Sequence, residues 1–127
     1  EMGMYTDPYQ HYGALSFEIW RACRLVVDTG LHAKRWTREQ AIAYMRAHTS
    51  NSELDIASEV DRYMVLPGQA LSYKVGELLI QSLRREAQAQ LGEAFDIKSF
   101  HEVVLGNGSV PLAVLEQQVR AWMAAQA

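Results

Sequence analysis

The segment that decides the fold lies near the start of the chain and reads Phe17-Glu-Ile-Trp-Arg21-Ala-Cys-Arg24-Leu-Val-Val-Asp28-Thr-Gly-Leu-His32. Successive residues of an α-helix are about 100° apart, so on a helix this segment sorts into two stripes. One stripe is apolar and comprises Leu15, Ile19, Ala22, Cys23, Val26 and Val27. The other, called the polar row below, comprises Arg21, Arg24, Asp28 and His32. The segment therefore predicts an amphipathic helix that packs its apolar stripe against a core.

Helix start and stop signals recur along the rest of the chain. Asp7-Pro8 pairs an N-cap residue with a proline at the first helical position, and Thr37-Arg-Glu-Gln40 has the form of a capping box. These and similar signals predict helices over residues 8–31, 38–47, 53–66, 69–90, 97–105 and 109–125. No segment alternates in the manner of a strand. We therefore expect an all-α fold, a five- to six-helix array that forms a single domain over residues 1–127.

Composition excludes several classes of protein. The chain has 127 residues, 49% of them hydrophobic, and a formal net charge of −3. Lysine and arginine are spread along the chain, so we expect no nucleic-acid partner. One cysteine cannot form an intrachain disulfide framework. No run approaches the roughly 18 apolar residues of a membrane span, so we expect no membrane segment.

The polar row has two interpretations. In one, it is a surface face on which Arg24 and Asp28 form an i,i+4 ion pair, worth only a few tenths of a kcal/mol. In the other, it lines a cleft in which Arg21 or Arg24 holds a substrate carboxylate and Asp28 orients the imidazole of His32. Periodicity alone slightly favours the surface face.

A second group of candidate residues surrounds Pro67-Gly68. Proline disfavours helical geometry at the preceding residue, and the break exposes backbone N–H groups that suit an anion or a carbonyl. Tyr63 and Tyr73 flank the break and could donate hydrogen bonds to an oxyanion. Gln69, Tyr73 and Gly76 would share one helix face. The alternative is that both tyrosines are core residues and Pro-Gly is a plain corner between helices.

The chain lacks a complete metal site. His101-Glu-Val-Val-Leu105 begins like a zinc-binding HExxH helix, but the second histidine is replaced by leucine. One histidine and one glutamate do not make a zinc site. We find no nucleophile triad or phosphate-binding loop either. We therefore expect no metal ligands and no cofactor in this chain, and no catalysis by the chain alone.

Four blocks of the sequence, in order along the chain, resemble the C-terminal part of the bacterial domain-of-unknown-function family 885. The blocks are Trp20-Arg-Ala-Cys-Arg-Leu-Val-Val-Asp-Thr-Gly-Leu-His-Ala33, Trp36-Thr-Arg-Glu-Gln-Ala41, Arg62-Tyr-Met-Val-Leu-Pro-Gly-Gln-Ala-Leu-Ser-Tyr-Lys-Val-Gly76 and Phe100-His-Glu-Val-Val-Leu-Gly-Asn-Gly-Ser-Val-Pro-Leu112. Members of that family are larger helical proteins that resemble zincin-like, HExxH-type peptidases. The resemblance implies that the chain is a C-terminal fragment of a larger helical zincin-like fold. It also implies that the zinc motif and a Glu-Gly-Trp-Ala segment lie upstream.

The resemblance gives the candidate residues roles in a zinc-dependent hydrolase. We expect this hydrolase to be a peptidase that binds zinc only in its full-length form. It implies that His32, Tyr63 and Tyr73 are catalytic, as donors to the developing oxyanion. It implies that a peptide-like substrate is bound by Arg21, Arg24, Asp28, Arg62 and Gln69. Related peptidases use an Arg-Tyr pair that Arg62-Tyr63 resembles, but the histidine that precedes their pair has no counterpart between Glu53 and Asp61. Tyr73 is therefore an equal candidate.

The resemblance favours the second interpretation of the polar row. The row is then one wall of a cleft, and the wall that carries the metal is absent from this chain. In this chain the row should then be exposed and idle. The alternative function is a non-catalytic helical interaction or dimerisation module. The expected partners are the upstream half of the parent chain and a second copy bound through exposed apolar faces. The compartment stays open between periplasmic or secreted and cytoplasmic.

Overall fold

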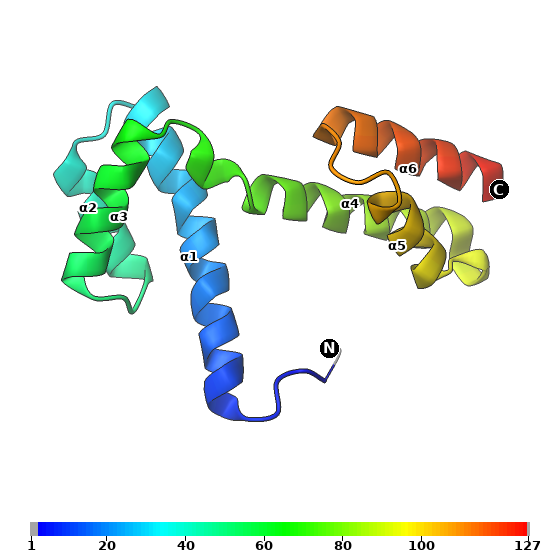
Figure 1. Ribbon diagram of the computed structural model, residues 1–127, viewed down its shortest axis with the longest axis horizontal. Coiled ribbons are helices and arrows are strands. Elements are labelled where there is room, and N and C mark those ends of the chain that lie inside the picture. The colour runs from blue at the N-terminus through cyan, green and yellow to red at the C-terminus, as the bar shows by residue number, and fades with distance from the viewer. Residues whose placement is uncertain (1–2, 127) are drawn as a thin grey trace. The chain divides into compact units, whose positions relative to one another are not determined.

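The structure, a computed structural model that describes residues 3–126, is helical and has no strand over that range (Figure 1). Its elements are α1 (Pro8–Ala33), α2 (Arg38–His48), α3 (Glu53–Val65), the 3-10 turn η1 (Gln69–Leu71), α4 (Lys74–Leu91), the 3-10 turn η2 (Gly92–Ala94), α5 (Ile97–Leu105) and α6 (Leu112–Gln126). The prediction of an all-α fold with five to six helices is confirmed. None of the helices in the described range is both long enough and apolar enough to cross a membrane.

The predicted caps start the helices as expected. The Asp7 side chain accepts hydrogen bonds from the backbone N–H groups of Tyr9 and Gln10, with Pro8 in the first turn. Thr37 and Gln40 form both hydrogen bonds of a capping box at the start of α2. These bonds satisfy N–H groups that a helix leaves free at its N-terminus.

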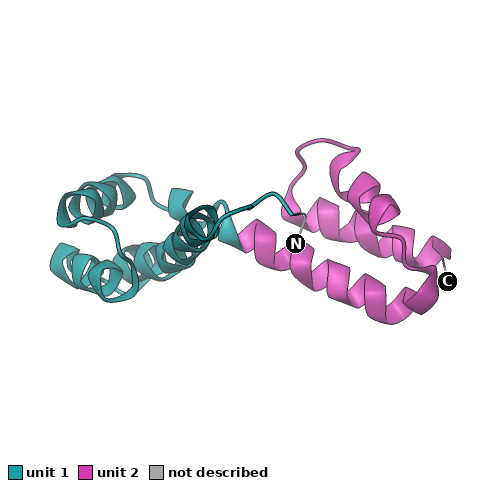
Figure 2. Cartoon of the chain, turned by 90° about the horizontal axis from the view of Figure 1, so that it is seen from below, with its two compact units in different colours: residues 1–74 teal, residues 75–127 magenta. Residues whose placement is uncertain are grey.

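The chain forms two compact units, residues 1–74 and 75–127 (Figure 2). The buried core of the first consists of Cys23, Val27, Ala41, Met45, Ile56, Val60, Tyr63 and Ala70. The buried core of the second consists of Leu83, Ala87, Phe100, Leu115, Val119 and Met123. The single domain over residues 1–127 that the sequence predicts stays a prediction.

The apolar stripe of α1 is only partly buried. Cys23 and Val27 lie in the core, whereas Leu15, Ile19 and Val26 are 54%, 43% and 36% exposed. The reason is length: α1 has 26 residues and its neighbours α2 and α3 have 11 and 13. At 1.5 Å per residue, α1 is about twice as long as either neighbour. The expectation that the whole stripe packs against a core is therefore wrong for its N-terminal half, and Val26 in the other half is also partly exposed.

Gly30 lies near the end of α1, which continues regularly to Ala33. A Cβ atom on Gly30 would lie 2.5 Å from the indole of Trp36, and Gly30 is buried. The glycine therefore allows Trp36 to pack directly on the helix backbone.

The predicted helix over residues 69–90 begins later than expected. Residues 69–71 form the turn η1, and the α-helix starts only at Lys74. Pro67 precedes the turn, and Gly68 has a φ of 81°, a left-handed conformation that favours glycine. Gln69 and Tyr73 consequently do not share an α-helical face with Gly76.

Candidate functional site

The polar row of α1 contacts the segment that connects α3 to α4. Arg24 and Asp28 are only 7% and 3% exposed. The expectation that the row is exposed and idle is therefore wrong for these two residues. Arg24 is hydrogen-bonded to Gln69, 45 residues further along the chain, and Asp28 to Gly68, 40 residues further along.

Asp28 occupies the backbone site that the Pro67-Gly68 break was expected to offer an anion. The N–H of Gly68 donates to Oδ1 and Oδ2 of Asp28, at 3.2 and 3.0 Å. The anion at the break is thus a carboxylate of the chain itself, not a ligand. Asp28 is therefore used to fix the turn and not, as one interpretation of the sequence held, to orient His32.

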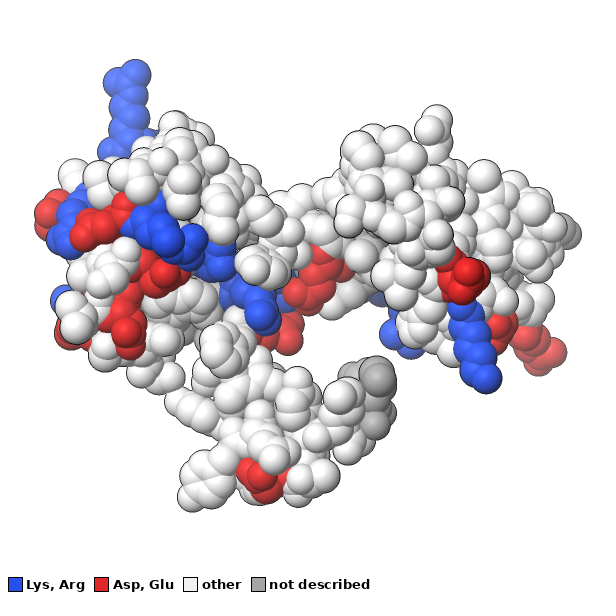
Figure 3. Space-filling view, in the orientation of Figure 1, with Lys and Arg blue, Asp and Glu red and all other residues white. Residues whose placement is uncertain are grey.

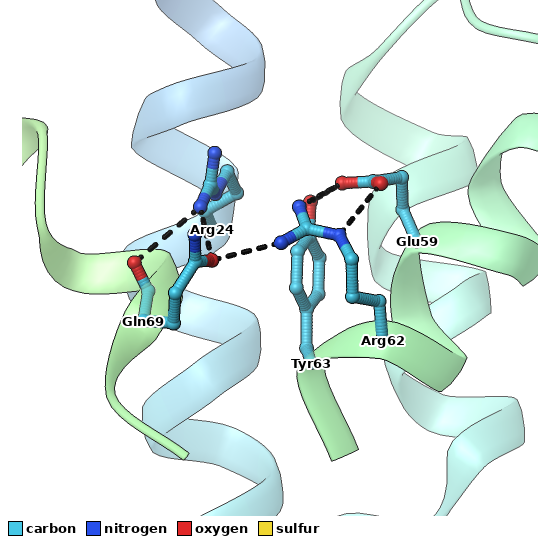
Figure 4. A network of polar contacts seen from close by, with 5 residues as sticks. All are labelled: Arg24, Glu59, Arg62, Tyr63 and Gln69. Carbon is cyan, nitrogen blue, oxygen red and sulfur yellow. Dashed lines mark hydrogen bonds and ion pairs between the residues drawn. The ribbon is translucent and has the colours of Figure 1, made fainter. Parts of the chain in front are cut away.

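Arg24 and Arg62 converge on one amide oxygen (Figure 4). Oε1 of Gln69 accepts from an Nη atom of Arg24 and from one of Arg62, each at 2.9 Å. Arg62 also donates through Nε and the other Nη atom to the two carboxylate oxygens of Glu59, at 2.9 and 2.6 Å. This fork holds the pKa of the Glu59 carboxyl below its usual range. The residues predicted to bind substrate here are bound to one another.

Tyr63 lies at the centre of the same network and is fully buried. Its hydroxyl donates to Oε2 of Glu59 at 2.9 Å (Figure 4). Burial, and then the neighbouring Glu59 carboxylate, raise the pKa of Tyr63 far above the ordinary tyrosine value. The guanidiniums of Arg24 and Arg62 lie over its ring, at 5.4 and 5.2 Å from the centroid. In this geometry the Tyr63 hydroxyl serves the network and is not directed to a ligand.

Tyr73 is placed differently, because its side chain remains half exposed. The residue is 54% exposed. Arg21 and Arg24 both lie 5.2 Å from the centroid of its ring, within the range of a cation–π contact. Arg21 also lies 5.8 Å from the ring centroid of Phe17, so its guanidinium contacts two aromatic rings. Tyr73, with Arg21 beside it, is an accessible part of the candidate site.

His32 lies at the other end of the polar row. Its Nε2 atom is 2.9 Å from the carbonyl oxygen of Tyr63. A carbonyl only accepts hydrogen bonds, so Nε2 carries the proton and Nδ1 is the remaining nitrogen for a ligand. Eleven residues of helix separate His32 from Arg21, which corresponds to about 16 Å along the axis. The structure therefore does not bring His32 together with Tyr73.

Two carboxylates of the site, Glu18 and Glu59, were missed by the sequence interpretation. Glu18 accepts from Nζ of Lys74 at 2.9 Å, and Lys74 is 8% exposed. Glu18 lies three residues before Arg21, so extending the polar row by one turn would have found it. Glu59 lies three residues before Arg62, and that i,i+3 spacing was the available signal. The polar row and Glu18 together contact successive residues of the segment 63–74. The contacts run from His32 with Tyr63 at one end to Glu18 with Lys74 at the other.

Zinc does not fit this set of residues. Within the range 3–126, no group of three or more His, Cys, Asp and Glu side chains is arranged to hold a metal ion. The carboxylate of Asp28 and one ring nitrogen of His32 already have partners in the chain. His101, from the incomplete HExxH motif, is an exposed residue of α5 in the other unit.

Comparison with known proteins shows a matching family and a similar solved structure. The family described as "Bacterial protein of unknown function (DUF885)" matches residues 1–119. The crystal structure of the "putative lipoprotein" from Colwellia psychrerythraea is similar over 97% of this chain, with 56% sequence identity and a TM-score of 0.92. The chain spans only 21% of that protein's length. No curated protein matches the chain.

Proposed function

The chain belongs to the DUF885 family of bacterial proteins of unknown function, and on that premise we propose that it is the substrate-facing C-terminal portion of a zinc-dependent hydrolase that acts on peptide-like substrates. The observation that carries the proposal is the pairing of a half-exposed tyrosine, Tyr73, with the guanidinium of Arg21. The proposal places the zinc ligands in the part of the parent protein outside residues 1–127. Activity belongs to that parent.

Arg21 is suited to bind a substrate carboxylate. Guanidinium is planar and can donate two parallel hydrogen bonds to a carboxylate, while its faces stack on aromatic rings. The contacts of Arg21 with Phe17 and Tyr73 involve the ring faces, at 5.8 and 5.2 Å. Stacking of this kind orients the guanidinium and leaves its in-plane N–H groups for a ligand.

Tyr73 is the stronger candidate for the oxyanion donor. The hydroxyl of Tyr63 is committed to Glu59 inside the unit, whereas Tyr73 is half exposed next to two cationic groups. A phenolic O–H near positive charge favours an oxygen on which negative charge develops. In this proposal Arg24, Asp28, Arg62 and Gln69 position Tyr73 by fixing the segment before it, and His32 acts at a separate point of the substrate.

The proposal is tested by turnover of the parent protein on a panel of peptides. Tyr73→Phe should lower turnover about 100-fold or more, as loss of an oxyanion donor does, and His32→Ala should lower it through the separate contact of His32 with the substrate. Tyr9→Phe is the matched control, because it removes a hydroxyl from a residue that is 88% exposed on α1. Near-normal turnover of both test variants would refute the assignment.

A second candidate function, a non-catalytic interaction module, is favoured by the exposed half of the apolar stripe. Leu15 and Ile19 lie 54% and 43% exposed on α1. Such a surface suits the upstream half of the parent chain or a second copy of this chain. Light scattering separates the cases: the isolated chain should form a dimer, and Ile19→Lys should convert it to a monomer. A wild-type chain that stays monomeric at high concentration would count against self-association.

A further inference from the structure

A cavity of about 260 Å³ lies beside α1 in the first unit, away from the polar network. It is lined by Tyr12, Gly13, Ser16, Phe17, Trp20, Ser50 and Asn51. Binding sites for whole small molecules are usually about 300–1,000 Å³. This cavity is smaller, so it suits one large side chain and not an entire ligand.

The lining is aromatic and carries no charge. Residues 8–17 include no Asp, Glu, Lys or Arg, and in Figure 3 the N-terminal half of α1, at the bottom of the view, is largely white. The rings of Tyr12, Phe17 and Trp20 supply apolar walls. At one side the hydroxyls of Tyr12 and Ser50 are hydrogen-bonded at 2.9 Å, which links the helix to the loop after α2. An apolar or aromatic occupant matches these walls.

Gly13 forms part of the cavity wall. It lies inside a 26-residue helix, where glycine is a poorer choice than alanine. Its φ is not positive, and a Cβ atom built on it would meet no atom within 4 Å. Packing among the described residues therefore gives no reason for the glycine. Its effect is to leave the helix backbone bare at the cavity wall.

The cavity borders the cationic end of the candidate site. Phe17 lines the cavity and is the ring that Arg21 contacts at 5.8 Å. The other ring at Arg21 is Tyr73. The nearby carboxylate of Glu18 is engaged by Lys74 at 2.9 Å, so it does not oppose an anion at Arg21. An uncharged pocket thus lies one helical turn from a cation.

We propose that this cavity binds the large apolar or aromatic side chain of a substrate residue whose free carboxylate is held by Arg21. The substrate class is then a peptide or acylated amino acid that ends in such a residue. A catalytic role for this binding rests on the proposed function. The binding itself is proposed to need only residues of this chain, without a metal or an upstream residue. Binding can therefore be tested on the chain of 127 residues.

The test is an NMR titration of the chain with N-acetyl-L-phenylalanine, N-acetyl-L-phenylalaninamide and N-acetyl-L-alanine. The phenylalanine acid should bind at least tenfold more tightly than either of the others, with shifts at the Gly13 amide and the Trp20 indole. Arg21→Gln should remove the preference for the acid over the amide. Gly13→Leu should weaken binding at least tenfold by filling the cavity, whereas Gly13→Ala should change it less than threefold.

Equal binding of the phenylalanine and alanine acids, or no binding of any probe, would overturn the proposal. The comparison of probes uses the wild-type chain, so it stands even where a variant fails to fold. Binding of the phenylalanine acid with unchanged affinity in Gly13→Leu would overturn the location. The hydrolase proposal is judged separately by turnover of the parent, so either proposal can fail without the other.

Discussion

The tie between Asp28 and Gly68 gives the sharpest test of the structural interpretation. The perturbation is Asp28→Ala, which removes the carboxylate that accepts from the Gly68 N–H at 3.0 Å. The variant therefore leaves the N–H group of Gly68 without its acceptor.

The expected loss follows from burial. A hydrogen bond to a charged group contributes about 1.5–3 kcal/mol, and an exposed i,i+4 ion pair only a few tenths. Asp28 is 3% exposed, so the larger range applies and we expect a loss of about 2–3 kcal/mol. For a unit of 74 residues this corresponds to a fall in Tm of roughly 10–20 °C.

Urea unfolding followed by tryptophan fluorescence measures the loss. The chain has three tryptophans, and Trp122→Phe leaves only Trp20 and Trp36, both in the first unit. In that background, Asp28→Asn is the matched control, because its amide oxygen can still accept from Gly68 and its loss should be clearly smaller. A free energy of unfolding for Asp28→Ala within 0.5 kcal/mol of that of the Trp122→Phe chain would refute the tie between Asp28 and Gly68 and restore the surface interpretation.

Three further predictions concern single groups. The pKa of Tyr63 is raised in the folded state, so the contribution of Tyr63 to stability is full below the ordinary tyrosine pKa of about 10 and is lost as pH rises through the folded-state pKa. Tyr63→Phe should therefore flatten the loss of unfolding free energy between pH 9 and 11. The lowered pKa of Glu59 has the opposite sign: its contribution is present above the unfolded pKa of about 4.3 and is lost as pH falls, so Glu59→Gln should flatten the acid limb of a urea-midpoint profile. Gly30→Ala should destabilise the first unit by about 1–2 kcal/mol in thermal unfolding, because the new Cβ would lie 2.5 Å from the Trp36 indole. Gly13→Ala in the same helix meets no neighbour and should stabilise the first unit by about 0.5–1 kcal/mol. Opposite signs for the two glycines are required; equal signs would contradict the packing at Gly30.

The helices were predictable because their signals are local. Caps such as Asp7 and Thr37 and the stop at Pro67 act within one turn, so the sequence locates most helix ends to within two residues. Burial of the polar row was not predictable in the same way. It depends on contacts between residues 40 or more positions apart, as between Asp28 and Gly68, and periodicity carries no information on such contacts.

The exposed apolar stripe of α1 was missed for a related reason. A hydrophobic stripe shows that a helix face avoids water, but it does not show whether the covering surface belongs to the same chain. Here α2 and α3 are too short to cover the N-terminal half of α1. The chain spans 21% of the length of a longer relative. The rest of such a protein is therefore one candidate for the surface that covers the stripe.

The division of the polar row into buried and accessible residues decides which mutations can test function. Arg24 and Asp28 fix the segment that leads to Tyr73. Under the proposed function, replacing either should lower activity of the parent by loosening that segment, whatever the chemistry. Tyr73 is half exposed, and its hydroxyl can be removed without opening the core. A loss of turnover in Tyr73→Phe at unchanged stability would therefore point to chemistry, whereas a loss in Asp28→Ala that follows the loss of folding free energy would point to positioning.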